Sequence, residues 1–141
     1  MSQDEPIFFI DRCLGNRRII EALEPLGIQL RTHDDHFAQT ALDIEWIPEI
    51  GRRGWIILTK DAAIARNQIE RQAITQANLR MFTLASQNLS GREMADSFRL
   101  AISDIKEFLN TNPSPFIAKI HRDGTVKAWK NADDLQAELS N

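Results

Sequence analysis

Residues 7–11 read Ile-Phe-Phe-Ile-Asp, and residues 55–61 read Trp-Ile-Ile-Leu-Thr-Lys-Asp. Each stretch is a short, continuous apolar run that ends in an aspartate, and such runs are typical of central strands covered on both faces. Helical patterns lie between the two runs and after the second one. Strands that alternate with helices predict an α/β domain with a mainly parallel central sheet and helices on both faces.

The spacing of apolar residues and the turn signals predict the remaining elements. We expect strands over 28–32 and 79–84 and helices over about 15–26, 41–53 and 90–109, with a helical stretch after Asp61 that reaches about residue 76 and breaks near Asn67. Pro48 is costly inside a helix, so the helix over 41–53 could begin near Ile47 instead. Residues 33–37 lack a clear period and are assigned to a loop. Asp123-Gly124 is a tight-turn signal that predicts a C-terminal hairpin, followed by a short helix or a frayed end.

Composition limits the classes of function. The chain has 141 residues, 43% of them hydrophobic and 26% charged, which is ordinary for one globular domain. No apolar run approaches the roughly 20 residues that span a bilayer, and the N-terminus does not resemble a secretory signal, so we expect a cytoplasmic protein without a membrane role. Cys13 is the only cysteine, which excludes an internal disulfide. The net charge of −3 means that any contact with RNA depends on a local basic patch.

The aspartates that end the two apolar runs are the first candidates for chemistry. In a parallel sheet, ligands bind beyond the carboxyl ends of the strands, and neighbouring strands would place Asp11 and Asp61 side by side there. Like charges so close repel one another unless a cation lies between them, and Mg²⁺ or Mn²⁺ prefers carboxylate oxygens. Asp43 or Glu45 could supply a third carboxylate at this edge. Alternatively, each of these acids caps or charges the first turn of a helix.

The order and spacing of several motifs resemble a known family. These motifs are Phe-Phe-Ile-Asp11, then His33-x-Asp35-His36-Phe37, Asp43-x-Glu45-Trp46 and the run from Gly54 to Asp61, with Asn67, Asn88-Leu89-Ser90-Gly91 and Pro115-Phe116-Ile117-Ala118 further on. Together they are similar to the PIN-like nucleases of the VapC toxin type, in their compact bacterial branch. The likeness covers about residues 7–121, so we expect a single PIN-like domain over 1–141 with a tail at 130–141. It implies a three-layer fold.

The resemblance also implies an activity. It indicates a metal-dependent endoribonuclease that uses Mg²⁺ or Mn²⁺, often the toxin of a type II toxin–antitoxin pair, with RNA as substrate, a cognate antitoxin as partner and a possible homodimer. Asp11, Asp61 and either Asp43 or Glu45 correspond to the family's metal-binding acids. The fourth acid of the common pattern would fall near Ser86-Gln87-Asn88, which has no carboxylate. Asn88 could hold a water or a ligand there, and the missing charge leaves the choice between one metal and two open.

Other polar residues receive supporting roles. Lys60 and Arg66 could neutralise phosphate charge, and Arg12, Arg17 and Arg18 could follow an RNA backbone, although each is also an ordinary surface charge. Asp35 could support the acid edge, and with His33 and His36 it could alternatively form a transition-metal site. Two other functions stay open: a catalytically silent PIN-like module that binds an antitoxin or RNA, and a phosphate-handling enzyme with aspartates at its strand ends.

Overall fold

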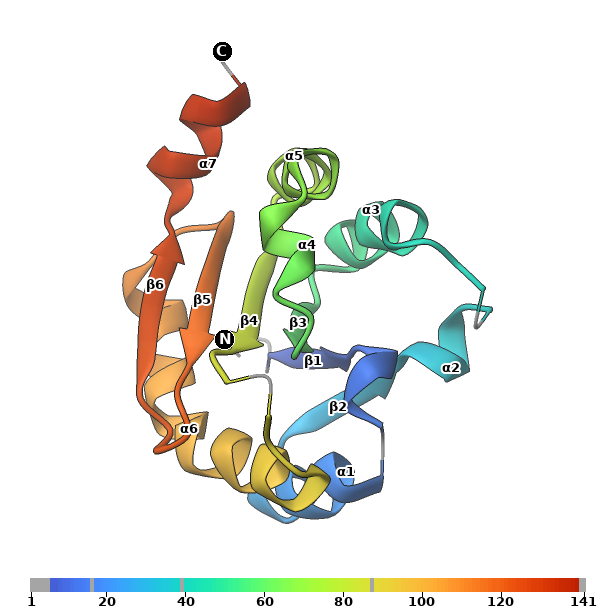
Figure 1. The fold of residues 1–141 in the computed structure, drawn as a ribbon, viewed down its shortest axis with the longest axis vertical. Helices are drawn as coiled ribbons and strands as arrows, with labels where there is room; N and C mark the ends of the chain where they lie inside the picture. Colours follow the sequence, from blue (N-terminus) through green and yellow to red (C-terminus); the bar gives the residue numbers. More distant parts are fainter. Residues whose placement is uncertain (1–5, 16, 39, 87, 140–141) are drawn as a thin grey trace, which may run out of the picture.

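The computed structural model describes residues 6–15, 17–38, 40–86 and 88–139. Within these residues, six strands form one sheet in the order β2-β1-β3-β4-β5-β6 (Figure 1). The strands are β1 Ile7–Ile10, β2 Gln29–Thr32, β3 Ile56–Thr59, β4 Arg80–Leu84, β5 Phe116–Ile120 and β6 Val126–Lys130. All neighbouring strands are parallel except β5 and β6, which form a hairpin. The predicted mainly parallel sheet with a C-terminal hairpin is therefore confirmed.

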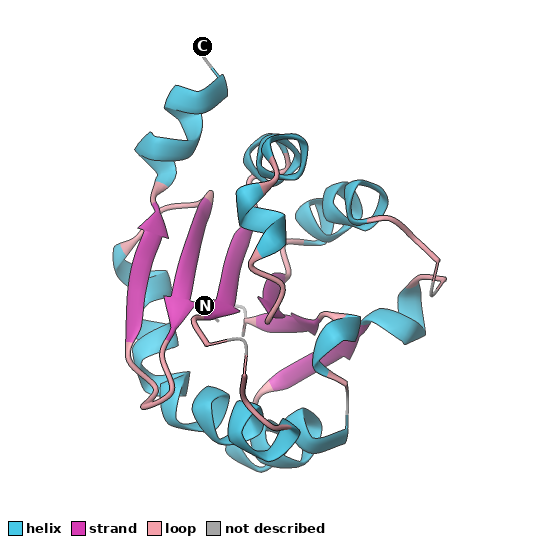
Figure 2. Ribbon diagram, viewed as in Figure 1, coloured by secondary structure: helices cyan, strands magenta, loops and turns pink. Residues whose placement is uncertain are grey.

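Helices cover both faces of this sheet (Figure 2). The α-helices are α1 Arg17–Leu23, α2 His33–His36, α3 Asp43–Arg53, α4 Ala63–Arg66, α5 Gln68–Gln76, α6 Gly91–Thr111 and α7 Ala132–Leu139, with short 3-10 helices at Arg12–Leu14 and Glu24–Leu26. Alternate strand residues point to opposite faces, so Phe8 packs with α1 and α6 whereas Phe9 packs with α3, α4 and α5. This is the expected three-layer arrangement. None of the described helices has the length and apolar character needed to cross a membrane.

One prediction about local structure was wrong, and one alternative was excluded. Residues 33–36 form one helical turn rather than a loop, and the Thr32 hydroxyl donates to the Asp35 carboxylate across that turn at 2.7 Å. The predicted helix over 41–53 is confirmed, because the helix containing Pro48 begins at Asp43, and the alternative start near Ile47 is excluded. Pro48 has no N–H to donate to the carbonyl of Ile44, but Ile44 is exposed, so water can replace the lost bond.

Helices α3 and α5 approach one another closely near their C-terminal ends. Gly51 of α3 faces Ala77, which follows α5, and a Cβ atom at Gly51 would lie 2.5 Å from the Ala77 carbonyl oxygen and 2.7 Å from its Cβ. A side chain at this position would force the two helices apart. The glycine therefore sets how closely the two helices pack.

Candidate active site

The register of the sheet places the ends of β1 and β3 beside each other. Phe9 is paired with Ile57 and Ile10 with Leu58, and the N–H of Asp11 donates to the Leu58 carbonyl at 3.0 Å. Asp11 and Asp61 thus follow neighbouring parallel strands at their carboxyl ends, as the two apolar runs predict.

Asp11 is a buried carboxylate, with only 7% of its surface exposed. It accepts hydrogen bonds from the Thr59 hydroxyl at 2.7 Å and from the Cys13 thiol at 3.4 Å. Burial raises the pKa of Asp11 above its usual value and the charge of Asp43 adds to this rise, whereas the bonds from Thr59 and Cys13 oppose it. Burial and the charge of Asp11 raise the pKa of Cys13 to about 11, so this thiol stays protonated at neutral pH and can donate to Asp11.

Asp61 is held by backbone contacts at the same strand ends. Its N–H donates to the Thr59 hydroxyl oxygen at 2.9 Å, so Thr59 contacts both Asp11 and Asp61. One Asp61 oxygen accepts from the N–H of Ala63 at 3.0 Å, in the first turn of α4. The Asp61 carboxylate therefore caps the start of α4, as the helix-capping alternative predicts. Its charge still acts on the nearby carboxyl of Glu70.

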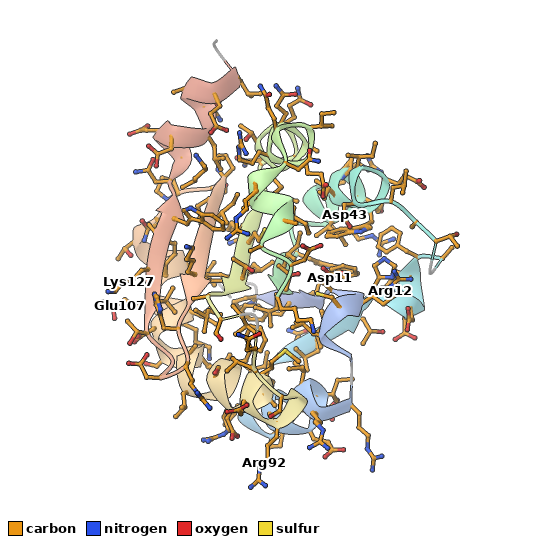
Figure 3. The ribbon with its side chains drawn as sticks, viewed as in Figure 1. Asp11, Arg12, Asp43, Arg92, Glu107 and Lys127 are labelled. Atoms are coloured by element: carbon orange, nitrogen blue, oxygen red, sulfur yellow. The ribbon has the colours of Figure 1, made fainter. Side chains whose placement is uncertain are left out.

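Asp43 and Glu45 differ in what they face, although both lie in the first turn of α3. Asp43 accepts a hydrogen bond from the indole N–H of Trp46 at 3.0 Å, and its negative charge helps to raise the pKa of Asp11. Glu45 is exposed and accepts from the N–H of Leu42 at 3.3 Å, which caps its own helix. Figure 3 shows Asp43 on α3 close to Asp11 at the end of β1. Of the two candidates, Asp43 is the one directed toward the other acids.

Glu70 is an acid that sequence reasoning missed. Asn67 caps α5 by accepting from the N–H of Glu70 at 3.1 Å, which fixes Glu70 in the first turn. Together with Asp43, Glu70 lines a hollow of about 280 Å³ between the first turns of α3 and α5. Burial, then the neighbouring carboxyl of Asp43 and then the charge of Asp61 raise the pKa of Glu70 to about 7. The Asn67 cap, which places an acid in the first turn of α5, is the signal in the sequence that could have identified it.

Comparison with known proteins identifies the family. Residues 6–86, more than half of the chain, match the family described as PIN like domain. The chain belongs to this PIN-like family. A Mycobacterium tuberculosis (strain ATCC 25618 / H37Rv) protein named "Putative ribonuclease VapC45" is 29% identical over 123 residues, which cover 84% of this chain and 88% of that protein. No solved structure gives a significant match. The resemblance to the VapC type of PIN-like protein is thereby confirmed.

The acids of this PIN-like domain suit a hard divalent cation in their chemistry. Among the described residues, no group of three or more His, Cys, Asp or Glu side chains is arranged so that it could hold a metal ion as it stands. However, Oε2 of Glu70 is buried without a hydrogen-bond partner in the described chain, and its neighbour Asp43 is also an acid. Carboxylate oxygens without donors are the ligands that Mg²⁺ and Mn²⁺ prefer. The chemistry of these carboxylates therefore fits such an ion, although the described side chains are not arranged around one.

The supporting residues expected in the PIN-like domain are distributed more widely. Lys60 is half-buried and follows Thr59 at the end of β3, whereas the guanidinium of Arg66 lies 5.9 Å from the ring centre of Trp129 on β6. Asp35 is exposed at the end of β2, and Asn88 is exposed in the loop before α6, where Gln87 lies outside the described residues.

The basic residues expected on the RNA path and the proposed histidine pair also have defined places. Arg12, Arg17 and Arg18 are exposed, and Arg17 forms an ion pair with Glu21 at 2.9 Å. His33 is buried against Phe9, Phe37 and Trp46, and His36 packs edge-on to Trp55. Nδ1 of His33 is buried without a hydrogen-bond partner among the described residues, 3.7 Å from a carboxylate oxygen of Asp34. Within the described part of the chain, the two histidines and Asp35 do not form a group that could hold a metal ion.

Proposed function

We propose that this chain is a metal-dependent endoribonuclease whose Asp11, Asp43 and Asp61 hold a Mg²⁺ or Mn²⁺ ion. The observation that carries the proposal is the buried Asp11 carboxylate, which has a raised pKa and faces the charge of Asp43 at the carboxyl ends of the central strands. A buried acid without a cationic partner is costly for stability, and such groups are concentrated at functional sites. Membership of the PIN-like family and similarity to a protein named as a ribonuclease agree with this function.

Within this proposal, each protein residue has a defined part. Thr59 orients Asp11 and positions the backbone of Asp61, and Trp46 orients Asp43 through its indole N–H. Glu70 supplies the fourth carboxylate that is lacking near Asn88, and Glu45 has a capping role instead. A bound divalent ion would supply an activated water and polarise the scissile phosphate. Lys60, which precedes Asp61 in the chain, would neutralise phosphate charge.

The proposed partner and cellular role are inferred from the similarity to the VapC45 protein. Because VapC is a toxin type, we propose that the chain acts as the toxin of a type II toxin–antitoxin pair in the cytoplasm and binds a cognate antitoxin. A homodimer is proposed on the same basis. Coexpression with the protein encoded by the adjacent gene, followed by co-purification, tests the partner, and light scattering of the purified chain tests the dimer.

Cleavage of a fluorescent single-stranded RNA tests the enzymatic proposal. We expect cleavage in Mg²⁺ or Mn²⁺, none in EDTA, and at least 100-fold slower cleavage by Asp11→Asn and Asp61→Asn variants that fold normally. Asp104→Asn, at an exposed position of α6, is the matched control and should cleave at the wild-type rate. Equal cleavage in EDTA would exclude metal dependence. Failure of the wild type to bind Mn²⁺ by calorimetry would favour the silent binding module.

A further inference from the structure

A row of polar side chains crosses the sheet from the acids to the C-terminal hairpin. Thr59 of β3 is paired with Thr83 of β4, and Thr83 is paired with Lys119 of β5. Lys119 is in turn directly opposite Lys127 of β6. Paired residues of neighbouring strands point to the same face, so these side chains share the face that carries Asp11 and helices α3 to α5. The hydroxyl of Thr83 is buried and has no partner among the described residues.

The lysine pair at the end of this row has uncompensated positive charge. Among the described residues, neither Lys119 nor Lys127 has a carboxylate within the 4.0 Å of an ion pair. Like charges directly opposite one another in an antiparallel pair destabilise the sheet. Lys130, on the same strand, instead pairs with Glu138 of α7 at 2.9 Å. An anion bound between Lys119 and Lys127 would remove their repulsion.

An aromatic ring lies within this basic surface. The ammonium of Lys119 is 4.1 Å from the ring centre of the half-buried Trp129, and the guanidinium of Arg66 is 5.9 Å from it. Among the described residues, Arg66 also lacks an ion pair with a carboxylate. Lys127 further lines a hollow of about 460 Å³ at the hairpin turn, together with His121, Arg122 and Asp123, although Arg122 is paired with Glu93. Cationic side chains around an aromatic ring are the usual composition of a surface that binds single-stranded nucleic acid.

We propose that Lys119, Lys127, Trp129 and Arg66, which we call the hairpin platform, bind single-stranded RNA and guide it toward the acid edge. The choice of RNA rests on the proposed nuclease function. Three strand spacings separate Asp11 from Lys119, about 14 Å, so a short stretch of one RNA strand can contact both places. The lysines and Arg66 bind phosphates, and Trp129 provides a surface for a base. Figure 3 shows Lys127 on the hairpin, across the sheet from Asp11.

Fluorescence anisotropy with a labelled oligouridylate of about twelve nucleotides, in EDTA, tests this proposal without requiring metal or cleavage. Each phosphate contact contributes about 0.7 to the slope of log affinity against log salt for single strands, so Lys119→Gln/Lys127→Gln should lower the slope by about 1.4. The same relation predicts about 25-fold weaker binding near 0.1 M salt. The control Arg99→Gln/Lys106→Gln removes two exposed charges from α6 and should bind as the wild type does. Trp129→Leu should weaken binding at least fivefold with an unchanged slope.

Unchanged affinity and slope in the Lys119/Lys127 variant would overturn the proposal, as would equal losses in the α6 control. Polyglutamate of the same charge is the competing ligand. If it binds the platform as tightly as RNA does and depends equally on both lysines, the surface is a site for an acidic protein segment and RNA is excluded. RNA binding that depends on the lysines, in a wild type that shows no metal-dependent cleavage, would leave the platform standing while the nuclease proposal fails. Metal-dependent cleavage together with RNA binding that does not depend on the lysines would support the nuclease proposal and overturn the hairpin platform.

Discussion

Replacement of Glu70 by glutamine should change the pH dependence of stability. In the wild type, burial and the neighbouring Asp43 and Asp61 carboxylates raise the pKa of Glu70 from 4.5 to about 7. Between these two values the folded state binds more protons than the unfolded state, so stability falls as pH rises through this range. Glutamine has nearly the same shape but cannot ionise. The loss of stability between pH 5 and 8 should therefore be smaller in Glu70→Gln.

The expected magnitude follows from the rise in the pKa of Glu70. A pKa difference of one corresponds to about 1.36 kcal/mol, so a rise from 4.5 to about 7 sets an upper bound of about 3 kcal/mol. Glu70 is only half-buried, and solvent screening reduces this to about 1 kcal/mol. We therefore expect Glu70→Gln to be more stable than the wild type by about 1 kcal/mol at pH 8 and to differ little at pH 5.

Urea unfolding followed by tryptophan fluorescence at pH 5, 6, 7 and 8 measures this difference. Glu107→Gln, at an exposed position of α6, is the control and should follow the wild type at every pH. Adding Mn²⁺ at pH 8 should stabilise the wild type more than Glu70→Gln, because the variant lacks one carboxylate of the proposed site. Parallel stability curves for the wild type and Glu70→Gln from pH 5 to 8 would refute the electrostatic reasoning, whatever the effect on cleavage.

Three further predictions concern Asp11, its partner Thr59 and the start of α6. Asp11→Asn should raise the free energy of unfolding at pH 7 by about 0.5–2 kcal/mol in urea titrations. The pKa of Asp11 is raised in the folded state, so the ionised carboxylate opposes folding at this pH. A variant less stable than the wild type would contradict this. Thr59→Val removes a donor to Asp11 and an acceptor for the Asp61 N–H. It should destabilise the fold by about 1–3 kcal/mol and weaken Mn²⁺ binding in calorimetry. Ser97→Ala is the control and should leave the affinity for Mn²⁺ unchanged. Ser90→Ala breaks the reciprocal cap with Glu93 at the start of α6 and should cost about 1 kcal/mol in thermal unfolding, whereas Ser103→Ala inside the same helix should change stability little.

The parts of the fold that could be predicted from sequence are those encoded by local patterns. Continuous apolar runs located β1 and β3, and the pairing of these strands brought Asp11 and Asp61 to one edge. The start of α3 was harder to predict, because the cost of Pro48 depends on whether the carbonyl of Ile44 can reach water, which only the packed structure reveals. The turn at 33–36 likewise lacks a periodic signal and depends on the local contact from Thr32 to Asp35.

The candidate site was predictable only where the sheet itself places the residues. Glu70 lies on a different helix from Asp43, and their proximity depends on how α3 packs against α5, which no sequence spacing records. The choice between Asp43 and Glu45 similarly required the direction of each side chain. Arg66 was predicted to neutralise phosphate charge, and the position of its guanidinium, 5.9 Å from the ring centre of Trp129 on the C-terminal hairpin, is likewise not recorded by sequence spacing.

The close contact between Gly51 and Ala77 also affects the distance between the carboxylates of Asp43 and Glu70, which neither residue touches. Asp43 lies eight residues before Gly51 on α3, about 12 Å along the axis, and Glu70 occupies the matching end of α5. Since the two helices meet at Gly51 and Ala77, we expect a larger residue there to move the helices apart and to change the spacing of the acids at their opposite ends. We therefore expect the size of one uncharged residue to set the spacing of these carboxylates, and with it the radius of ion that the proposed site would accept, with every charged group left in place.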